Sequence, residues 1–346
     1  MLSVLPIFSP SFIRSGRTRL LRLLHTRQLA GVLLYSLLIP GCATPWQNHS
    51  LPANLPASIE LDQTPFFPQT HYQCGPAALA TVLATQGANV TLNTLVEQVY
   101  IPGMQGSLPE EITSTARSYG MLAYPLAPAL ADLLAEVAHG HPVLVFQNLG
   151  LRWLPKWHFS VVIGYNLEQG ELILRSGTTR RWRTTLTTFE RTWARGNYWA
   201  LVILPAGKVP STAQVGPYLQ ASYDLEQTGK PGLSHRAYLA GSERWPDNSY
   251  LWIALGNSHY AAGSFTHAAT AYRKATQLEP NAASGWNNLA YALLKTRCPE
   301  QALQAANCAR QAAPGDSRIL ETLTEIKNLA KEKAAGQCPA VSCDTP

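Results

Sequence analysis

The C-terminal third of the chain repeats its pattern of apolar, aromatic and small residues every 34 positions. Proline recurs at Pro246, Pro280 and Pro314, and the positions in the same phase are Trp252/Trp286, Leu255/Leu289, Gly256/Ala290, Ala268/Ala302 and Ala275/Ala309. A degenerate earlier copy is indicated by Tyr218, Ser222, Gly229 and Ala237. A period of this length predicts stacked pairs of helices, for which three units are about the minimum.

A further helix is expected after the last repeat. Residues 316–333 place Ile319, Leu320, Leu323, Ile326 and Leu329 on one stripe, and Gly336 ends the pattern. We therefore predict an all-α repeat domain at 213–335 with a capping helix, followed by a flexible tail at 336–346. The small and aromatic positions resemble the tetratricopeptide repeat (TPR), which implies a solenoid whose groove binds a protein or an extended peptide.

Residues 66–208 show a different pattern, with helical periodicity first and short β-branched runs afterwards. Helices are predicted at 75–86, 109–119 and 129–138, the second opened by Pro109 with two glutamates at its positive end. Strands are predicted at 143–149, 158–166, 171–177 and 198–205. Helices followed by an antiparallel sheet predict an α+β domain.

The first 41 residues have the pattern of a bacterial lipoprotein signal. Five arginines precede the apolar run Leu29–Ile39, which ends at Cys42. This resemblance implies that Cys42 is lipidated, and Ala43 after it implies the outer membrane, with the body facing the periplasm. An uncleaved anchor helix is the alternative. Prolines at 45, 52, 56 and 65 predict a Pro-rich tether at 42–65.

The charge of the chain does not predict nucleic-acid binding. The formal net charge is +6, but the leader carries five arginines and no acidic residue, and removing it leaves +1. Charged residues are 14% and hydrophobic residues 46%, which excludes a disordered chain. No set of His, Cys, Asp or Glu has zinc spacing, so we expect no metal and no cofactor.

Five cysteines remain once Cys42 is assigned to lipid, an odd number for an oxidising compartment. Cys338 and Cys343 can close a small loop, or they can pair with Cys298 and Cys308; the sequence leaves this open. The leftover thiol is Cys74 in HYQCGPAALATVL, at the start of a predicted helix. A helix start can hold a thiolate, although a buried inert cysteine would give a similar pattern.

The neighbours of Cys74 favour catalysis. Gln69 lies five residues upstream, and its amide can help to stabilise an oxyanion. His158 heads a predicted strand 84 residues downstream and is the candidate base. His139 and His141 look like solvent-facing loop residues, and His71 is too near in sequence to face Cys74 across a cleft.

Three segments together resemble the papain-like cysteine peptidases of the bacteriocin-processing (double-glycine leader) family. They are Gln69 with Cys74–Leu79, Gly106-Ser107, and His158-Phe159 leading Val161–Tyr165. The resemblance covers residues 66–205. It implies a papain-like fold with Cys74 as nucleophile, His158 as general base and Gln69 as oxyanion donor. It also implies a peptide or protein substrate.

The sequence departs from this family where an aspartate usually follows the histidine. Ser176 occupies that position, and no aspartate lies between His158 and Gly196. Ser176 can orient the imidazole but supplies no charge. The main prediction is therefore an envelope-anchored cysteine peptidase, and the alternative is a catalytically degenerate scaffold. A weaker option is acyl transfer through the same pair.

Two further groups have alternative interpretations. Arg180, Arg181 and Arg183 form a local basic patch, which we interpret as a solvated strand edge. Trp153 and Trp157 flank His158 and either line a substrate groove or pack into the core.

Overall fold

The computed structural model describes residues 51–52, 54–69, 72–329, 338 and 340–343. The chain divides into the units Met1–Pro45 and Trp46–Pro346, and all described residues belong to the second. The predicted signal peptide at 1–41 and the lipidation site Cys42 lie outside the described residues. In the described part, no helix combines the length and apolar character needed to cross a bilayer.

A seven-stranded antiparallel sheet is the centre of the N-terminal half. Its order is β2-β7-β3-β4-β5-β6, and β1 pairs with β4. The strands are β1 (Ser58–Glu60), β2 (Met121–Pro125), β3 (Val143–Asn148), β4 (Trp157–Asn166), β5 (Glu171–Ser176), β6 (Thr179–Thr185) and β7 (Ala200–Pro205). This confirms the α+β prediction, and the predicted strands agree with β3, β4, β5 and β7.

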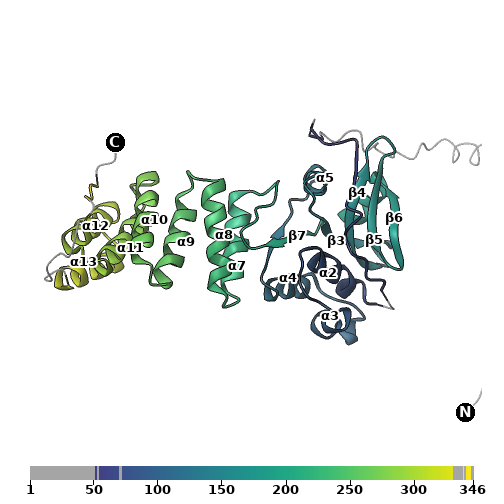
Figure 1. Ribbon diagram of the computed structural model, residues 1–346, viewed down its shortest axis with the longest axis horizontal. Helices are drawn as coiled ribbons and strands as arrows, with labels where there is room; N and C mark the ends of the chain where they lie inside the picture. The colour runs from purple at the N-terminus through teal and green to yellow at the C-terminus, as the bar shows by residue number, and fades with distance from the viewer. Residues whose placement is uncertain (1–50, 53, 70–71, 330–337, 339, 344–346) are drawn as a thin grey trace, which may run out of the picture. The chain divides into compact units, whose positions relative to one another are not determined.

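Helices cover both faces of this sheet (Figure 1). They are α2 (Cys74–Thr85), α3 (Leu92–Val99), α4 (Pro109–Ser118), α5 (Leu130–Ala138) and α6 (Leu186–Ala194). Neighbouring β4 residues point to opposite faces, so Val161 and Ile163 join the core under α2 and α4, whereas Val162 packs with α5 and α6. The helix that begins at Cys74 is therefore fixed against the central strands.

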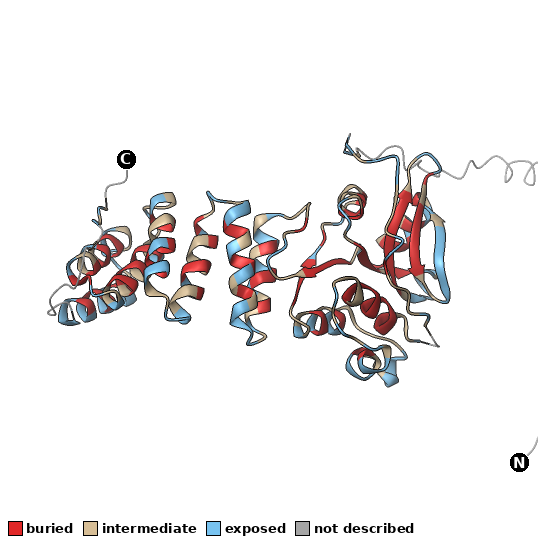
Figure 2. Ribbon diagram, in the orientation of Figure 1, coloured by how far each residue is buried: buried red, intermediate tan, exposed pale blue. Residues whose placement is uncertain are grey.

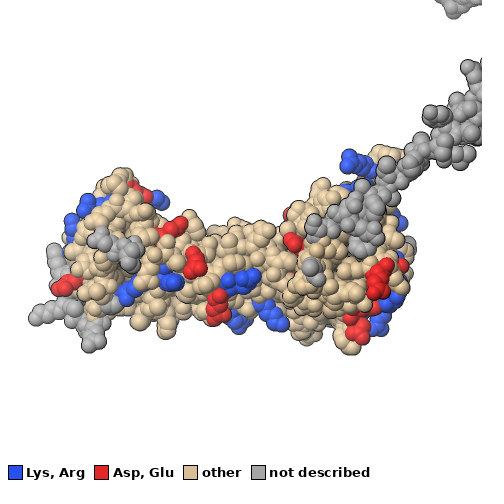
Figure 3. All heavy atoms as spheres, turned by 90° about the horizontal axis from the view of Figure 1, so that it is seen from above, with Lys and Arg blue, Asp and Glu red and all other residues tan. Residues whose placement is uncertain are grey.

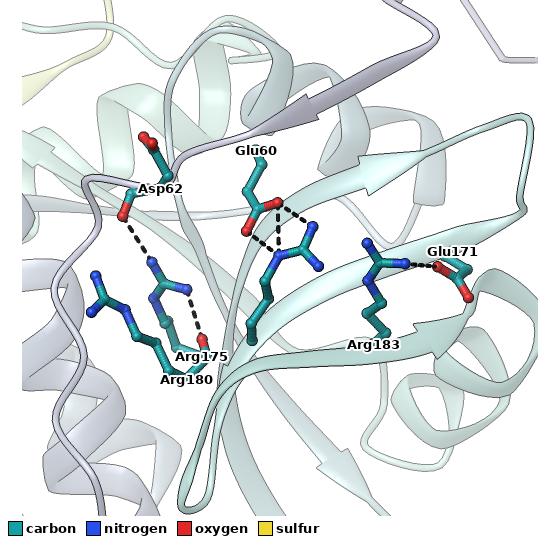
Figure 4. Close-up of polar contacts among 7 residues, drawn as sticks. Glu60, Asp62, Glu171, Arg175, Arg180 and Arg183 are labelled. Atoms are coloured by element: carbon teal, nitrogen blue, oxygen red, sulfur yellow. Dashed lines mark hydrogen bonds and ion pairs between the residues drawn. The ribbon is translucent and has the colours of Figure 1, made fainter.

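The end of the predicted tether belongs to the sheet, which corrects the prediction for 58–65. Strand β1 pairs with the end of β4, and Leu61 N–H donates to Ile163 O at 2.7 Å. The buried Arg175 guanidinium donates to the backbone carbonyl of Asp62 (Figure 4) and to that of Thr64. These bonds hold the chain that leads to Gln69.

The basic patch is an exposed edge strand, as predicted. Strand β6 is the last strand of the sheet, and its side chains are mostly exposed (Figure 2). Arg181 pairs with Glu60 at 2.6 Å, and Arg183 with Glu171 at 3.3 Å (Figure 4). On the face drawn in Figure 3, charged side chains of both signs are scattered among wide uncharged areas.

Residues 215–329 form the predicted run of repeat helices. They are α7 (Val215–Glu226), α8 (Pro231–Arg244), α9 (Ser249–Ala261), α10 (Phe265–Leu278), α11 (Ala283–Lys295), α12 (Pro299–Ala312) and α13 (Ser317–Leu329). The period is also visible in hydrogen bonds, because Trp252 Nε1 donates to Pro246 O and Trp286 Nε1 donates to Pro280 O. Helix α13 takes the place of the predicted capping helix.

The tail is joined to the repeats by two disulfides. Cys298 is bonded to Cys338 and Cys308 to Cys343, which resolves the pairing that the sequence left open. Cys338 and Cys343 lie in the range predicted as a flexible tail, so that prediction is wrong for these residues. Cys74 is the free cysteine of the described residues.

A buried carboxylate fastens the segment between the sheet and the repeats. Glu136 in α5 is fully buried and accepts hydrogen bonds from Thr212 N–H at 2.7 Å and Thr212 Oγ1 at 2.6 Å. His141 Nδ1 lies 2.6 Å from the other oxygen of the same carboxylate. His141 is therefore a partly buried structural residue, not the solvent-facing loop residue expected from sequence.

Candidate active site

Cys74 is the first residue of α2, the most deeply buried helix of the N-terminal half (Figure 2). Residues 75–83 of this helix are buried without interruption. Glycine is required at position 75, because a Cβ there would lie 2.5 Å from Ser107 Oγ. The missing side chain lets the Ser107 loop pack against the helix start.

Two backbone features lie just before α2 in the described chain. Gln69 N–H donates to Gly177 O at 3.2 Å, which ties the approach to the turn between β5 and β6. Tyr72 has the left-handed value φ = 63°, a conformation that costs about 1–3 kcal/mol in a residue other than glycine. These features set the positions of Gln69 and Cys74.

His158 is the second residue of β4 and pairs with Gln147 of β3. His158 Nε2 and Ser176 Oγ are hydrogen-bonded at 2.8 Å. Ser176 is the last residue of β5, the neighbouring strand. The sheet thus brings the sequence-predicted histidine and its predicted orienting residue together.

One cavity of about 990 Å³ is lined by three of the four residues predicted for the active site. Gln69, Cys74 and His158 line it together with Tyr72, Met104, Gln105, Gly106, Ser107, Leu108, Pro109, Phe146, Pro155, Lys156, Trp157, Phe159 and Thr178. Ser176 is not among the residues that line this cavity, but its hydroxyl contacts His158. No hydrogen bond joins Cys74 to His158 within the described part of the chain. Catalytic contacts are often long until substrate binds.

Both reactive groups favour their neutral forms. Burial raises the pKa of the Cys74 thiol, and it outweighs the hydrogen bonds from the backbone amides of Phe159, Gly75 and Cys74 that favour the thiolate. Burial, assisted by the Lys156 ammonium, lowers the pKa of His158 to about 4. Burial therefore opposes the thiolate that the helix start suggested.

The two tryptophans near His158 lie in different places. Trp157 lines the cavity and is 51% exposed, so the groove interpretation applies to it. Trp153 is 79% exposed and lies outside the cavity. The described residues contain no group of three or more His, Cys, Asp or Glu able to hold a metal ion.

Sequence reasoning missed several residues of the cavity wall. Met104 ends a short 3₁₀ turn, Lys156 precedes β4, and Phe146 comes from β3. The Ser107 hydroxyl is buried, with no hydrogen-bond partner among the described residues. Of these four residues, only Ser107 could have been found from the sequence, because it belongs to a segment that carries the family resemblance.

Comparison with known proteins agrees with this geometry. Residues 61–200 match the model of the peptidase C39-like family. This part of the chain is therefore similar to the C39-like peptidases. A TPR-repeat model matches residues 256–296, so a C39-like segment is followed by a TPR-like segment. No curated protein matches the chain.

Solved structures resemble each half separately. A C39-like peptidase from Bacillus anthracis is 17% identical, covering 42% of this chain and 97% of its own, with a TM-score of 0.36. The peptidase domain of Streptococcus ComA is 23% identical, covering 41% and 98%, with a TM-score of 0.33. The Yersinia enterocolitica secretion chaperone SycD is 16% identical, covering 35% and 99%, with a TM-score of 0.33.

Proposed function

We propose that the chain is a cysteine peptidase that hydrolyses peptide bonds through Cys74 and His158. The observation that carries this proposal is the shared cavity, in which a helix-start cysteine, a strand-start histidine and Gln69 line one surface. The match of residues 61–200 to the C39-like family supports it.

In the proposed reaction, the sulfur of Cys74 bonds to the carbonyl carbon of the substrate while the thiol proton passes to His158. The carbonyl oxygen becomes an oxyanion that accepts hydrogen bonds from the Gln69 amide and the Cys74 backbone N–H. His158 protonates the leaving amine as the C–N bond breaks, which leaves a thioester. A water molecule that gives its proton to His158 hydrolyses the thioester and restores the thiol.

Ser176 has the role of a positioning residue in this scheme. Its hydrogen bond to Nε2 fixes the ring and leaves Nδ1 as the nitrogen that exchanges protons with the sulfur. Because a hydroxyl is neutral, it stabilises the imidazolium less than a carboxylate would. We therefore expect slower chemistry than in a site with an acidic third member.

The remaining parts of the proposal concern location and partners. Residues 1–41 would direct export, lipid on Cys42 would anchor the chain to the outer membrane, and the TPR groove would bind a protein or an extended peptide. Two disulfides support an oxidising compartment. Labelling of the full chain in cells with radioactive palmitate should be lost in Cys42→Ala; retained label would refute the anchor.

A non-catalytic scaffold is the second candidate. It is favoured by the neutral Ser176 partner and by the raised pKa of Cys74. Iodoacetamide labelling of Cys74, followed from pH 5 to 10 in wild type and His158→Ala, separates the two. A catalytic pair gives a rate that depends on His158, and Cys74→Ala then abolishes hydrolysis of peptides. A slow rate that is identical in both proteins supports the scaffold.

A further inference from the structure

The wall of the cavity beside His158 is aromatic and rigid. The Trp157 ring stacks on Phe146 with centroids 5.1 Å apart and an interplanar angle of 11°. Phe146 in turn packs against Phe159 at 4.5 Å and meets Trp199 edge-on at 6.4 Å. Stacking fixes the Trp157 ring, although half of its surface remains exposed.

An exposed apolar side chain also lines the cavity from another element. Met104 is 60% exposed at the end of the 3₁₀ turn Pro102–Met104. Leu108 and Pro109 extend this apolar lining toward α4. Burying such surface gains about 25 cal/mol per Å², so the free cavity has unused binding energy for an apolar group.

The charges around the cavity select against a basic group. Among its lining residues, Lys156 carries the one fixed charge, and none is aspartate or glutamate. A lysine or arginine side chain would meet the Lys156 ammonium without a carboxylate partner. An uncharged side chain meets neither repulsion nor an unpaired buried ion.

The volume of the cavity also favours a large side chain. At about 990 Å³ it equals the upper end of the usual range for ligand pockets, about 300–1,000 Å³. Glycine residues on both sides of a scissile bond would leave the aromatic wall uncovered. Trp157 and Met104 line the same cavity as Cys74, so a large apolar side chain bound there would bury part of their exposed surface.

We propose that the cavity takes a large apolar side chain, aromatic or long aliphatic, on the residue that supplies the scissile carbonyl, and that Trp157 and Met104 determine this preference. The inference rests on the proposed function, because it assigns the substrate class of the same site.

The test uses three peptidyl chloromethyl ketones that differ only in the residue next to the ketone: phenylalanine, glycine or lysine. The full chain is treated with each, and mass spectrometry of the Cys74 peptide gives the labelling rate. Each rate is divided by the iodoacetamide rate of the same protein. We expect the phenylalanine reagent to exceed the glycine reagent by about a hundredfold or more, since each methylene adds a factor of about 10–200.

Two variants assign the preference to the wall. Trp157→Ala should reduce the ratio of the phenylalanine to the glycine reagent by about tenfold or more. Trp182→Ala is the matched control, because Trp182 is also half exposed at 50% but lies on β6 outside the cavity. Its ratio should equal that of wild type.

The outcomes separate the two proposals. Equal rates for all three reagents, or a Trp157→Ala ratio like that of wild type, would overturn the substrate class and leave the peptidase proposal standing. Slow labelling of Cys74 by iodoacetamide and by every ketone, unchanged in His158→Ala, would overturn both.

Discussion

Replacing Ser176 by aspartate tests how this site controls its proton. The Ser176 hydroxyl is 2.8 Å from His158 Nε2, so an aspartate carboxylate can reach the same ring nitrogen. Burial and Lys156 lower the pKa of His158 to about 4, and no acidic side chain of the described residues opposes this shift. Ser176→Asp supplies that partner.

The magnitude follows from Coulomb's law. Opposite charges about 4 Å apart gain about 4 kcal/mol at an effective dielectric constant of about 20. Desolvation of the new carboxylate offsets part of this gain, and one pKa unit corresponds to about 1.4 kcal/mol. We therefore expect the pKa of His158 to rise to between about 5 and 7. The imidazolium then stabilises the thiolate, and iodoacetamide labelling of Cys74 near pH 6 should accelerate by about tenfold.

Two measurements follow this change. Titration of the His158 ring signal by NMR, assigned with His158→Gln, gives the histidine pKa directly. The labelling rate of the Cys74 peptide, measured by mass spectrometry at each pH, gives the thiolate fraction. Ser176→Asn is the matched uncharged control, and its His158 pKa should stay near that of wild type. A His158 pKa that remains near 4 in Ser176→Asp would refute the electrostatic account of this pair.

Three further predictions concern packing, cross-links and the buried carboxylate. Gly75→Ala should lower the free energy of unfolding in urea by about 1–3 kcal/mol, because the new Cβ meets Ser107. The double variant Gly75→Ala/Ser107→Gly should recover most of this loss. Equal stability of Gly75→Ala and wild type would contradict the packing. Cys343→Ser removes the disulfide to Cys308, which joins residues 35 positions apart, and should lower the free energy of unfolding of the repeat region by about 4 kcal/mol. The labelling rate of Cys74 should stay unchanged. An unchanged melting temperature would argue against this disulfide. Burial opposes ionisation of Glu136, but the hydrogen bonds to its carboxylate outweigh burial and lower its pKa. The ionised carboxylate therefore stabilises the fold above pH 4.5, its ordinary pKa, and this contribution is lost as the pH falls through the lower folded-state pKa. Glu136→Gln should flatten this part of the pH–stability curve, and a curve as steep as that of wild type would contradict it.

The elements that the sequence predicted are those with strong local patterns. Strands β3, β4, β5 and β7 are runs of β-branched and aromatic residues, and the repeat helices recur with a fixed period. Strand β1 has three residues and follows a proline-rich stretch, so nothing local distinguishes it from a tether. It exists because β4 offers an edge there, and Gly164 lets its backbone approach closely. Such tertiary causes have no sequence period.

The candidate site was partly predictable, because some of its residues lie in strong local patterns. Short local patterns identified Gln69, Cys74 and His158, and the cavity lined by all three is consistent with them. The protonation states were not predictable, because they depend on how completely the sheet and the Ser107 loop cover the sulfur and the ring. A helix start favours thiolate, but burial has the larger effect on Cys74. The disulfide pairing likewise required the packing of α11, α12 and the tail.

The neutral pair and the disulfides have a common physical consequence in the proposed function. Thiolates oxidise more readily than thiols, and Cys74 is the free cysteine of the described residues in a chain that carries two disulfides. Burial that raises the pKa of Cys74 therefore protects the sulfur under oxidising conditions, at the expense of nucleophilic reactivity. A substrate that fills the apolar cavity replaces water around the pair and brings the carbonyl to the sulfur, so proton transfer to His158 accompanies attack instead of preceding it. Ser176 suits this order of events, because a neutral partner orients the ring without stabilising the ion pair before substrate arrives.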